Sequence, residues 1–159
     1  MEEVITEFKG EWEGLSNFAP CHIFAREFEF PTLENAFQAL KCIKDSDAAR
    51  FVSLSPGDAK RLGRRVDLRP DWERVKVSIM KSLLRQKFLS KPEYTCLLLS
   101  TGYARLEEGN TWGDRFWGVC LPKREGKNML GRLLMEIREE IRIMQSGVWP
   151  EQKQEVASK

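Results

Sequence analysis

The stretch Pro31-Thr32-Leu33-Glu34-Asn35-Ala36-Phe37-Gln38-Ala39-Leu40-Lys41 joins a helix start signal to a helix face that mixes apolar and polar side chains. Thr32 is the predicted N-cap residue, because a threonine hydroxyl can accept a hydrogen bond from a free N–H group of the first helical turn. A helix is therefore predicted from Leu33 to about Ile43.

Three polar side chains of this helix fall on one stripe. Glu34, Gln38 and Lys41 lie at positions i, i+4 and i+7, beside the apolar residues Phe37 and Leu40. In a pocket wall, burial would raise the pKa of Glu34 or lower the pKa of Lys41 towards a catalytic range. A solvated Glu–Lys face is the commoner arrangement, so the spacing alone leaves both interpretations open.

The remaining elements are predicted to be mostly helices with a few short strands. Ser55 is a predicted N-cap residue, and the apolar residues between Trp72 and Phe88 have the spacing of a long amphipathic helix. The predicted strands cover residues 4–8, 23–30 and 104–107, and the further helices cover residues 47–54, 56–63, 70–88, 92–100 and 128–145. This order lacks regular βαβ alternation, so it predicts an α+β fold.

Length and composition predict a single compact domain. The chain has 159 residues, of which 42% are hydrophobic, and this is enough for one core. The domain is expected over residues 1–149. Residues 150–159 have little apolar surface to bury and are expected to form a flexible C-terminal tail.

Charge and hydropathy exclude several classes of protein. The 26 Lys+Arg and 24 Asp+Glu residues give a net charge of +2, too low for a protein that binds nucleic-acid backbones over a broad surface. No apolar run approaches the roughly 18 residues of a transmembrane helix, and acidic residues follow Met1 where a signal peptide would carry basic ones. We expect a soluble cytoplasmic protein with no membrane partner.

Cysteine and histidine usage argues against a metal centre. Cys21, Cys42, Cys96 and Cys120 are isolated from one another and are expected to be reduced thiols. His22 is the single histidine, so sites that need two imidazoles are excluded. If the protein is an enzyme without an external cofactor, its proton transfers must therefore use carboxylates, lysine, tyrosine or bound water.

An aromatic and glycine-rich segment over residues 108–118 is the second candidate functional element. It contains two tryptophans, one asparagine, two carboxylates and three glycines. Glycine lets the backbone approach a ligand closely, and a tryptophan face can stack on a base or a sugar. The competing interpretation is an irregular segment anchored in the core by Trp112 and Trp117.

Three weaker signals accompany this segment. Residues 126–131 precede the last predicted helix, whose free N–H groups could hold a phosphate. The basic stretch over residues 60–65 could contact phosphate oxygens or be an ordinary charged helix end. Ser16 and Asn17 are expected to form either a capping turn or the rim of a pocket.

Taken together, these segments resemble the NADAR superfamily, the YbiA-like N-glycosidases, over about residues 8–145. The matching stretches are collinear and cover residues 15–18, 31–41, 59–64, 71–72, 87–88, 106–118 and 126–135, with Met80 between them. Asn35 departs from the pattern, because many members carry histidine at that position. The departure removes a role for an imidazole there and leaves Glu34 unaffected.

The resemblance implies a compact, mostly helical α+β fold that cleaves N-glycosidic bonds without a cofactor. The implied substrates are small nucleotide-like molecules, namely phosphorylated ribosylamino-pyrimidines of the riboflavin pathway, or ADP-ribosylated guanine bases in nucleic acid. Glu34 and Asp114 become acid/base or oxocarbenium-stabilising carboxylates, and Lys41 either attacks C1′ or neutralises a phosphate. The implied substrate-binding residues are Asn17, Phe18, Gln38, Arg64, Glu108, Trp112, Trp117, Gly118 and Asn128.

Two other classes of function compete with an enzyme. A non-catalytic module that binds NAD or ADP-ribose would be expected to have lost its carboxylates, whereas Glu34 and Asp114 are both present. If the protein were a helical interaction protein without a pocket, the Trp, Gly and Asp residues of the segment 108–118 would need a purely structural explanation. Both alternatives are weaker than the enzyme, and the oligomeric state is left open.

Overall fold

The computed structural model describes residues 1–147, so the tail predicted over residues 150–159 lies outside the described residues. Helices dominate, with short strands between them, and the predicted α+β class is confirmed. In chain order the elements are β1 (Val4–Ile5), a 3-10 helix (Gly10–Leu15), β2 (Pro20–Ala25), β3 (Phe28–Thr32), α1 (Leu33–Ala39), α2 (Asp45–Ala48), a second 3-10 helix (Ala49–Ser53), α3 (Pro56–Leu62), α4 (Trp72–Ser90), α5 (Pro92–Ser100), β4 (Arg105–Leu106), β5 (Gly109–Asn110), β6 (Val119–Cys120) and α6 (Met129–Ser146).

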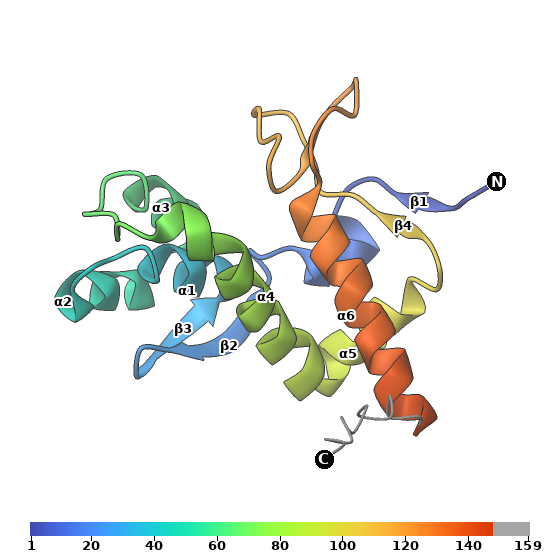
Figure 1. The fold of residues 1–159 in the computed structure, drawn as a ribbon, viewed down its shortest axis with the longest axis horizontal. Coiled ribbons are helices and arrows are strands. Elements are labelled where there is room, and N and C mark those ends of the chain that lie inside the picture. Colours follow the sequence, from blue (N-terminus) through green and yellow to red (C-terminus); the bar gives the residue numbers. More distant parts are fainter. Residues whose placement is uncertain (148–159) are drawn as a thin grey trace, which may run out of the picture.

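Helix α4 is the centre of the molecule. Figure 1 shows α1, α2, α3 and the β2–β3 hairpin on one side of it and α5, α6 and the β1–β4 pair on the other. The strands form two-stranded pairs: β1 and β4 are parallel, β2 and β3 are antiparallel, and β5 and β6 are parallel. The strands therefore form short pairs that pack beside the helices, and they do not form a layer of their own.

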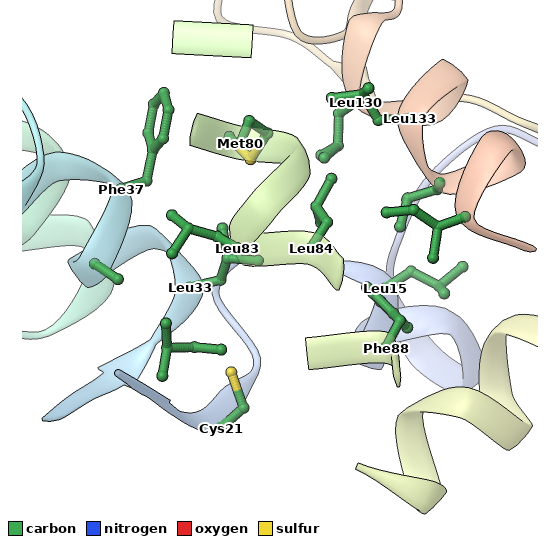
Figure 2. Close-up of a cluster of buried hydrophobic side chains, with 14 of the residues drawn as sticks. Leu15, Cys21, Leu33, Phe37, Met80, Leu83, Leu84, Phe88, Leu130 and Leu133 are labelled. Carbon is green, nitrogen blue, oxygen red and sulfur yellow. The ribbon is translucent and has the colours of Figure 1, made fainter. Parts of the chain in front are cut away.

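One hydrophobic core surrounds α4. Figure 2 shows side chains of α4 between those of α1 and those of α6. The fully or almost fully buried members include Leu33, Phe37, Met80, Leu83, Leu84, Phe88, Leu130 and Leu133. No helix within residues 1–147 is both long and apolar enough to cross a membrane.

The start of α1 agrees with the prediction, whereas its end does not. The Thr32 hydroxyl accepts a hydrogen bond from the backbone N–H of Asn35 at 3.1 Å, as expected of an N-cap. The helix ends at Ala39, not near Ile43. The Arg26 guanidinium donates to the carbonyl oxygens of Ala39, Cys42 and Ile43. It thereby supplies hydrogen bonds to carbonyl oxygens at and just after the end of α1.

The single strand predicted over residues 23–30 is wrong, because the chain reverses there. Arg26 and Glu27 have φ angles of 51° and 66°, and they form the tight turn of the β2–β3 hairpin. Arg26 interrupts the apolar alternation of the sequence because it is this turn residue. The strand predicted over residues 4–8 is also shorter, with only Val4–Ile5 paired.

Most of the other helices lie close to their predicted bounds. The Ser55 hydroxyl accepts from the backbone N–H of Asp58 and begins α3 as expected. Helices α4, α5 and α6 match the predicted ranges to within two residues. The helix predicted over residues 47–54 is instead a short α-helix followed by a 3-10 helix, and Asn35 ties it to α1 by donating to the carbonyl oxygens of Phe51 and Leu54.

A fully buried lysine joins α4 to the turn between the first 3-10 helix and β2. The Lys87 ammonium donates to the Ser16 carbonyl oxygen at 2.9 Å and lies 4.6 Å from the centre of the Tyr94 ring. Burial lowers the pKa of Lys87 from its ordinary 10.5 to about 8. This contact holds the turn next to Asn17, which lines the cavity described below.

Lys87 should make the stability of the fold pH-dependent. Its pKa is lower in the folded chain than in the unfolded chain, so the unfolded state binds more protons between pH 8 and 10.5, and folding becomes more favourable as pH rises there. Relative to Lys87→Met, the wild-type free energy of unfolding should rise by up to about 3 kcal/mol between pH 7 and pH 10. Urea unfolding of both proteins in reductant measures this difference. Equal pH dependence would show that Lys87 does not titrate in this range.

Candidate active site

A cavity of about 360 Å³ is lined by residues of α1, α3, the first half of α4 and the start of α6, together with the segments 8–9, 16–18 and 108–117. The predicted catalytic residues Glu34, Lys41 and Asp114 all line it. Among the predicted substrate-binding residues, the cavity is lined by Asn17, Phe18, Gln38, Arg64, Glu108, Trp112 and Trp117. Gly118 and Asn128 do not line it. Segments that lie far apart in the sequence thus meet at one place.

Glu34 is a buried carboxylate on the first turn of α1. Its side chain is held by Gln38, whose Nε2 donates to Oε1 at 2.8 Å, and the residue is only 7% exposed. Burial raises the pKa of Glu34, and the Gln38 hydrogen bond and the ammonium groups of Lys60 and Lys41 oppose this shift. The i, i+4 spacing of the sequence therefore produces a real amide–carboxylate pair on a cavity wall, not a solvated face.

Lys41 follows the end of α1 and still faces the same cavity. Burial lowers the pKa of Lys41, the nearby Glu34 carboxylate opposes the shift, and Arg64 and Lys60 add to it. Its ammonium nitrogen lies 5.7 Å from the centre of the Trp72 ring. A lysine whose pKa is lowered by burial exposes more of its neutral, nucleophilic amine at neutral pH.

Asp114 is fixed by the backbone of its own loop. Its Oδ1 accepts from the N–H groups of Phe116 at 3.1 Å and Trp117 at 2.9 Å. Asn110, which is buried, accepts from the Asp114 N–H and donates to the carbonyl oxygens of Asp114 and Val119. These hydrogen bonds fix the position of the Asp114 carboxylate in the cavity wall. Asn110 was not predicted as a site residue, although an asparagine inside a glycine-rich segment was the available signal.

Glu108 is the third carboxyl group of the cavity. Its Oε2 is buried and has no hydrogen-bond partner among the described residues. Burial raises the pKa of Glu108 to about 7, the negative charges of Asp114 and Glu34 add to this, and Lys60 opposes it. A carboxyl group in this environment is partly protonated at neutral pH.

Asn128 and Gly118 hold the backbone of Glu108 from outside the cavity. The Asn128 side chain accepts from the Glu108 N–H at 3.1 Å and donates to the Leu106 carbonyl oxygen at 2.8 Å. The Glu108 carbonyl oxygen accepts from the Val119 N–H, and a Cβ at Gly118 would lie only 2.2 Å from that oxygen. Both residues therefore contribute to the site through Glu108.

The phosphate site expected at the start of α6 is already occupied by the chain itself. The N–H groups of Lys127, Met129 and Leu130 donate to the carbonyl oxygens of residues 115–117, and the Asn128 N–H donates to Gly118. These contacts attach the aromatic loop (orange, beside the start of α6 in Figure 1) to the helix. The N–H groups at the start of α6, which the sequence suggested as phosphate ligands, therefore bind the backbone of residues 115–118.

Two exposed aromatic rings flank a lysine at the mouth of the cavity. Phe18 is 41% exposed and Trp112 is 59% exposed, and the Lys60 ammonium lies 6.0 Å and 5.0 Å from their ring centres. Trp117 differs, because its ring packs edge-on against Phe37 with the ring centres 5.4 Å apart. Of the two predicted stacking tryptophans, Trp112 offers a free face and Trp117 forms part of the wall.

Two buried amide oxygens in the cavity wall are also unpartnered. Neither Asn17 Oδ1 nor Gln38 Oε1 has a hydrogen-bond partner within the described part of the chain. Buried acceptors without partners are costly, and sugar hydroxyl groups are donors that would satisfy them. The wall is therefore suited to a polyhydroxylated ligand.

Sequence reasoning missed several lining residues. They are Phe8, Lys9, Ser16, Phe37, Lys60, Met80, Gly109 and Leu130. The apolar members have the spacing of ordinary core residues, and Ser16 and Lys60 were noticed only as a possible rim and as part of a basic stretch. Within residues 1–147, no group of three His, Cys, Asp or Glu residues is arranged to hold a metal ion.

Comparisons with known proteins agree on one family. The NADAR domain family matches residues 6–142. The N-glycosidase YbiA of Escherichia coli is 39% identical over 150 residues, which cover 90% of this chain and 92% of that protein. An N-glycosidase of Nostoc punctiforme is 39% identical over 133 residues, covering 80% of this chain and 84% of that protein.

A plant relative and a solved structure extend the comparison. A chloroplastic riboflavin biosynthesis protein of Zea mays is 35% identical over 161 residues, which cover 88% of this chain and 26% of that protein. The NMR structure of the Escherichia coli protein YbiA superposes with a TM-score of 0.79 at 35% identity, covering 96% of this chain and 93% of that one. On this family match and these identities, the chain belongs to the NADAR domain family.

Proposed function

We propose that this protein is an N-glycosidase that hydrolyses the bond between a base and C1′ of a phosphorylated ribose. The observation that carries the proposal is the convergence of carboxylates and cations on one cavity of about 360 Å³. The carboxylates are Glu34, Glu108 and Asp114, and the cations are Lys9, Lys41, Lys60 and Arg64. The relatives from Nostoc punctiforme and Escherichia coli are named as N-glycosidases, which supports the same class of reaction.

The carboxylates suit the charge changes of this reaction. Cleavage of a C1′–N bond builds positive charge on the ribose, and a fixed negative charge nearby stabilises it. Asp114 is suited to this role by its position, because the backbone N–H groups of Phe116 and Trp117 hold its Oδ1 in the cavity wall. Glu34, with a pKa raised by burial, is suited to accept a proton from the attacking group.

The other cavity groups match the rest of the substrate. The unpartnered oxygens of Asn17 and Gln38 would accept hydrogen bonds from ribose hydroxyls. Lys60 and Arg64 would bind the phosphate, and a base would stack on the exposed face of Trp112. Lys41 would either attack C1′, a role that its lowered pKa favours, or neutralise the phosphate.

A phosphorylated ribosylamino-pyrimidine is the preferred substrate. The maize relative, of which this chain spans about a quarter, is named for riboflavin biosynthesis, and so is a relative from Vibrio vulnificus. An ADP-ribosylated guanine base is the second candidate from the family resemblance. A module that binds NAD or ADP-ribose without cleavage is the alternative that the same cavity allows.

Product analysis tests the proposed function directly. The pure protein is incubated with a ribosylamino-pyrimidine 5′-phosphate and, in parallel, with an ADP-ribosylated guanosine oligonucleotide, and the products are identified by mass spectrometry. We expect free pyrimidine and ribose 5-phosphate from the first substrate. Free ADP-ribose and unmodified oligonucleotide from the second alone would identify the other substrate class. Binding of ADP-ribose with no product from either would favour the non-catalytic module.

Glu34→Gln should abolish turnover and preserve the fold. The variant removes the carboxylate but retains the shape of the side chain, so kcat should fall at least about 100-fold while ligand affinity changes little. Steady-state kinetics and calorimetric titration with ribose 5-phosphate measure the two effects. Glu93→Gln, an exposed change on α5, is the matched control. Unchanged kcat in Glu34→Gln would remove Glu34 from the mechanism.

Attack by Lys41 would leave a trappable intermediate. If its amine displaces the base, the opened sugar forms an imine that borohydride reduces to a stable adduct. Peptide mass spectrometry after turnover in borohydride should therefore find the sugar phosphate on Lys41, and Lys41→Met should give no adduct. A wild-type protein that turns over without an adduct, together with a raised KM in Lys41→Met, would assign Lys41 to phosphate binding instead.

A further inference from the structure

Glu108 differs from the other two carboxyl groups of the cavity in its hydrogen bonds. Asp114 Oδ1 accepts from two backbone N–H groups, and Glu34 Oε1 accepts from the Gln38 amide. Glu108 Oε2 is buried in the same cavity wall and accepts from no donor among residues 1–147. An unpartnered oxygen is stabilised when it carries a proton and donates that proton to an acceptor on a ligand.

We propose that Glu108 is the general acid that protonates the leaving base. The inference rests on the proposed N-glycosidase function and adds to it the residue that supplies the proton. Asp114 and Glu34 are held as acceptors by their donors, so Glu108 is the carboxyl group of the three that is free to donate.

The backbone around Glu108 is fixed as an acid of this kind requires. The Asn128 side chain holds its N–H, and the Val119 N–H holds its carbonyl oxygen. Gly118 approaches that oxygen so closely that any side chain would displace it. These contacts fix the point of the backbone from which the Glu108 side chain reaches the cavity wall.

The charges that face Glu108 come from four separate parts of the chain. They are the carboxylates of Glu34 and Asp114 and the ammonium groups of Lys9 and Lys60. Burial is the largest influence and raises the pKa of Glu108 to about 7, and the balance of these four charges does not reverse it. A pKa near the working pH is the value at which general acid catalysis is most efficient.

The proton balance of the step is complete without a further reactant. The C1′–N bond breaks, its electron pair goes to the base nitrogen, and the Glu108 proton goes to the same nitrogen. The attacking group, water or the Lys41 amine, forms the new bond to C1′ and releases one proton. That proton is taken up by Glu34, and exchange through water returns Glu108 to its acid form. When Lys41 attacks, water then hydrolyses the C1′–Lys41 adduct, which releases the sugar phosphate and restores the amine. Nothing is oxidised or reduced.

The first test measures the proton itself and needs no substrate. In protein labelled with carboxyl-¹³C glutamate, we expect one resonance that titrates with a midpoint near pH 7 and that is missing from Glu108→Gln. Asp114→Asn should move this midpoint to lower pH, because it removes a negative charge that favours the protonated form. A Glu108 midpoint below about pH 5 would overturn the proposal, because the group would then be ionised at neutral pH.

The second test is kinetic and uses ribosylamino-pyrimidine 5′-phosphate. Wild-type kcat should fall as pH rises through about 7, and Glu108→Gln should lose this limb and at least about 100-fold in kcat, with KM within about threefold. Glu93→Gln should behave as wild type. A raised KM with retained kcat in Glu108→Gln would make Glu108 a binding residue and overturn the proposal. Release of base by the wild-type protein tests the proposed function separately, so the two can fail independently.

Discussion

Burial of the Glu34 carboxylate inside the fold is the constraint on which the rest of the site depends. Gln38 lies one helical turn further on and donates to that carboxylate. The amide of Gln38 fits only because α3 ends in glycine, since a Cβ at Gly63 would lie 1.9 Å from Gln38 Oε1. Lys41 and Lys60 supply the positive charge that partly offsets the cost of burial. The sequence of α1, the close approach of α3 and the cations at the cavity thus all reduce the free-energy cost of burying the Glu34 carboxylate.

The cavity has two chemically different ends. Its interior carries Glu34 and the unpartnered oxygen of Glu108, whereas its mouth carries two exposed rings with Lys60 over both. In the proposed reaction the sugar occupies the interior, where a low dielectric strengthens every interaction with developing charge. The aromatic mouth then receives the planar part of the substrate. This division allows the site to combine tight control of protons at C1′ with tolerance towards the base.

Much of the fold and of the candidate site could be read from the sequence, and the failures share a physical cause. The cap at Thr32 and the shared stripe of Glu34 and Gln38 depend on neighbours within one or two helical turns, and both are present as predicted. The hairpin turn at Arg26 was missed, because residues with positive φ other than glycine leave no compositional signal. The early end of α1 and the cavity position of Lys9 depend on contacts between distant segments, which no local pattern records.

The cavity wall is assembled from residues that run from Phe8 to Leu130, and its carboxyl groups come from both halves of the chain. The proposed active site therefore exists only when α1 and the segment 108–118 are both packed in place, with α4 between the two halves. A shorter fragment would hold only part of the constellation. In a single cooperative domain of this size, heat inactivation and global unfolding are the same transition. The remaining enzymatic activity would therefore measure the fraction of molecules that are folded.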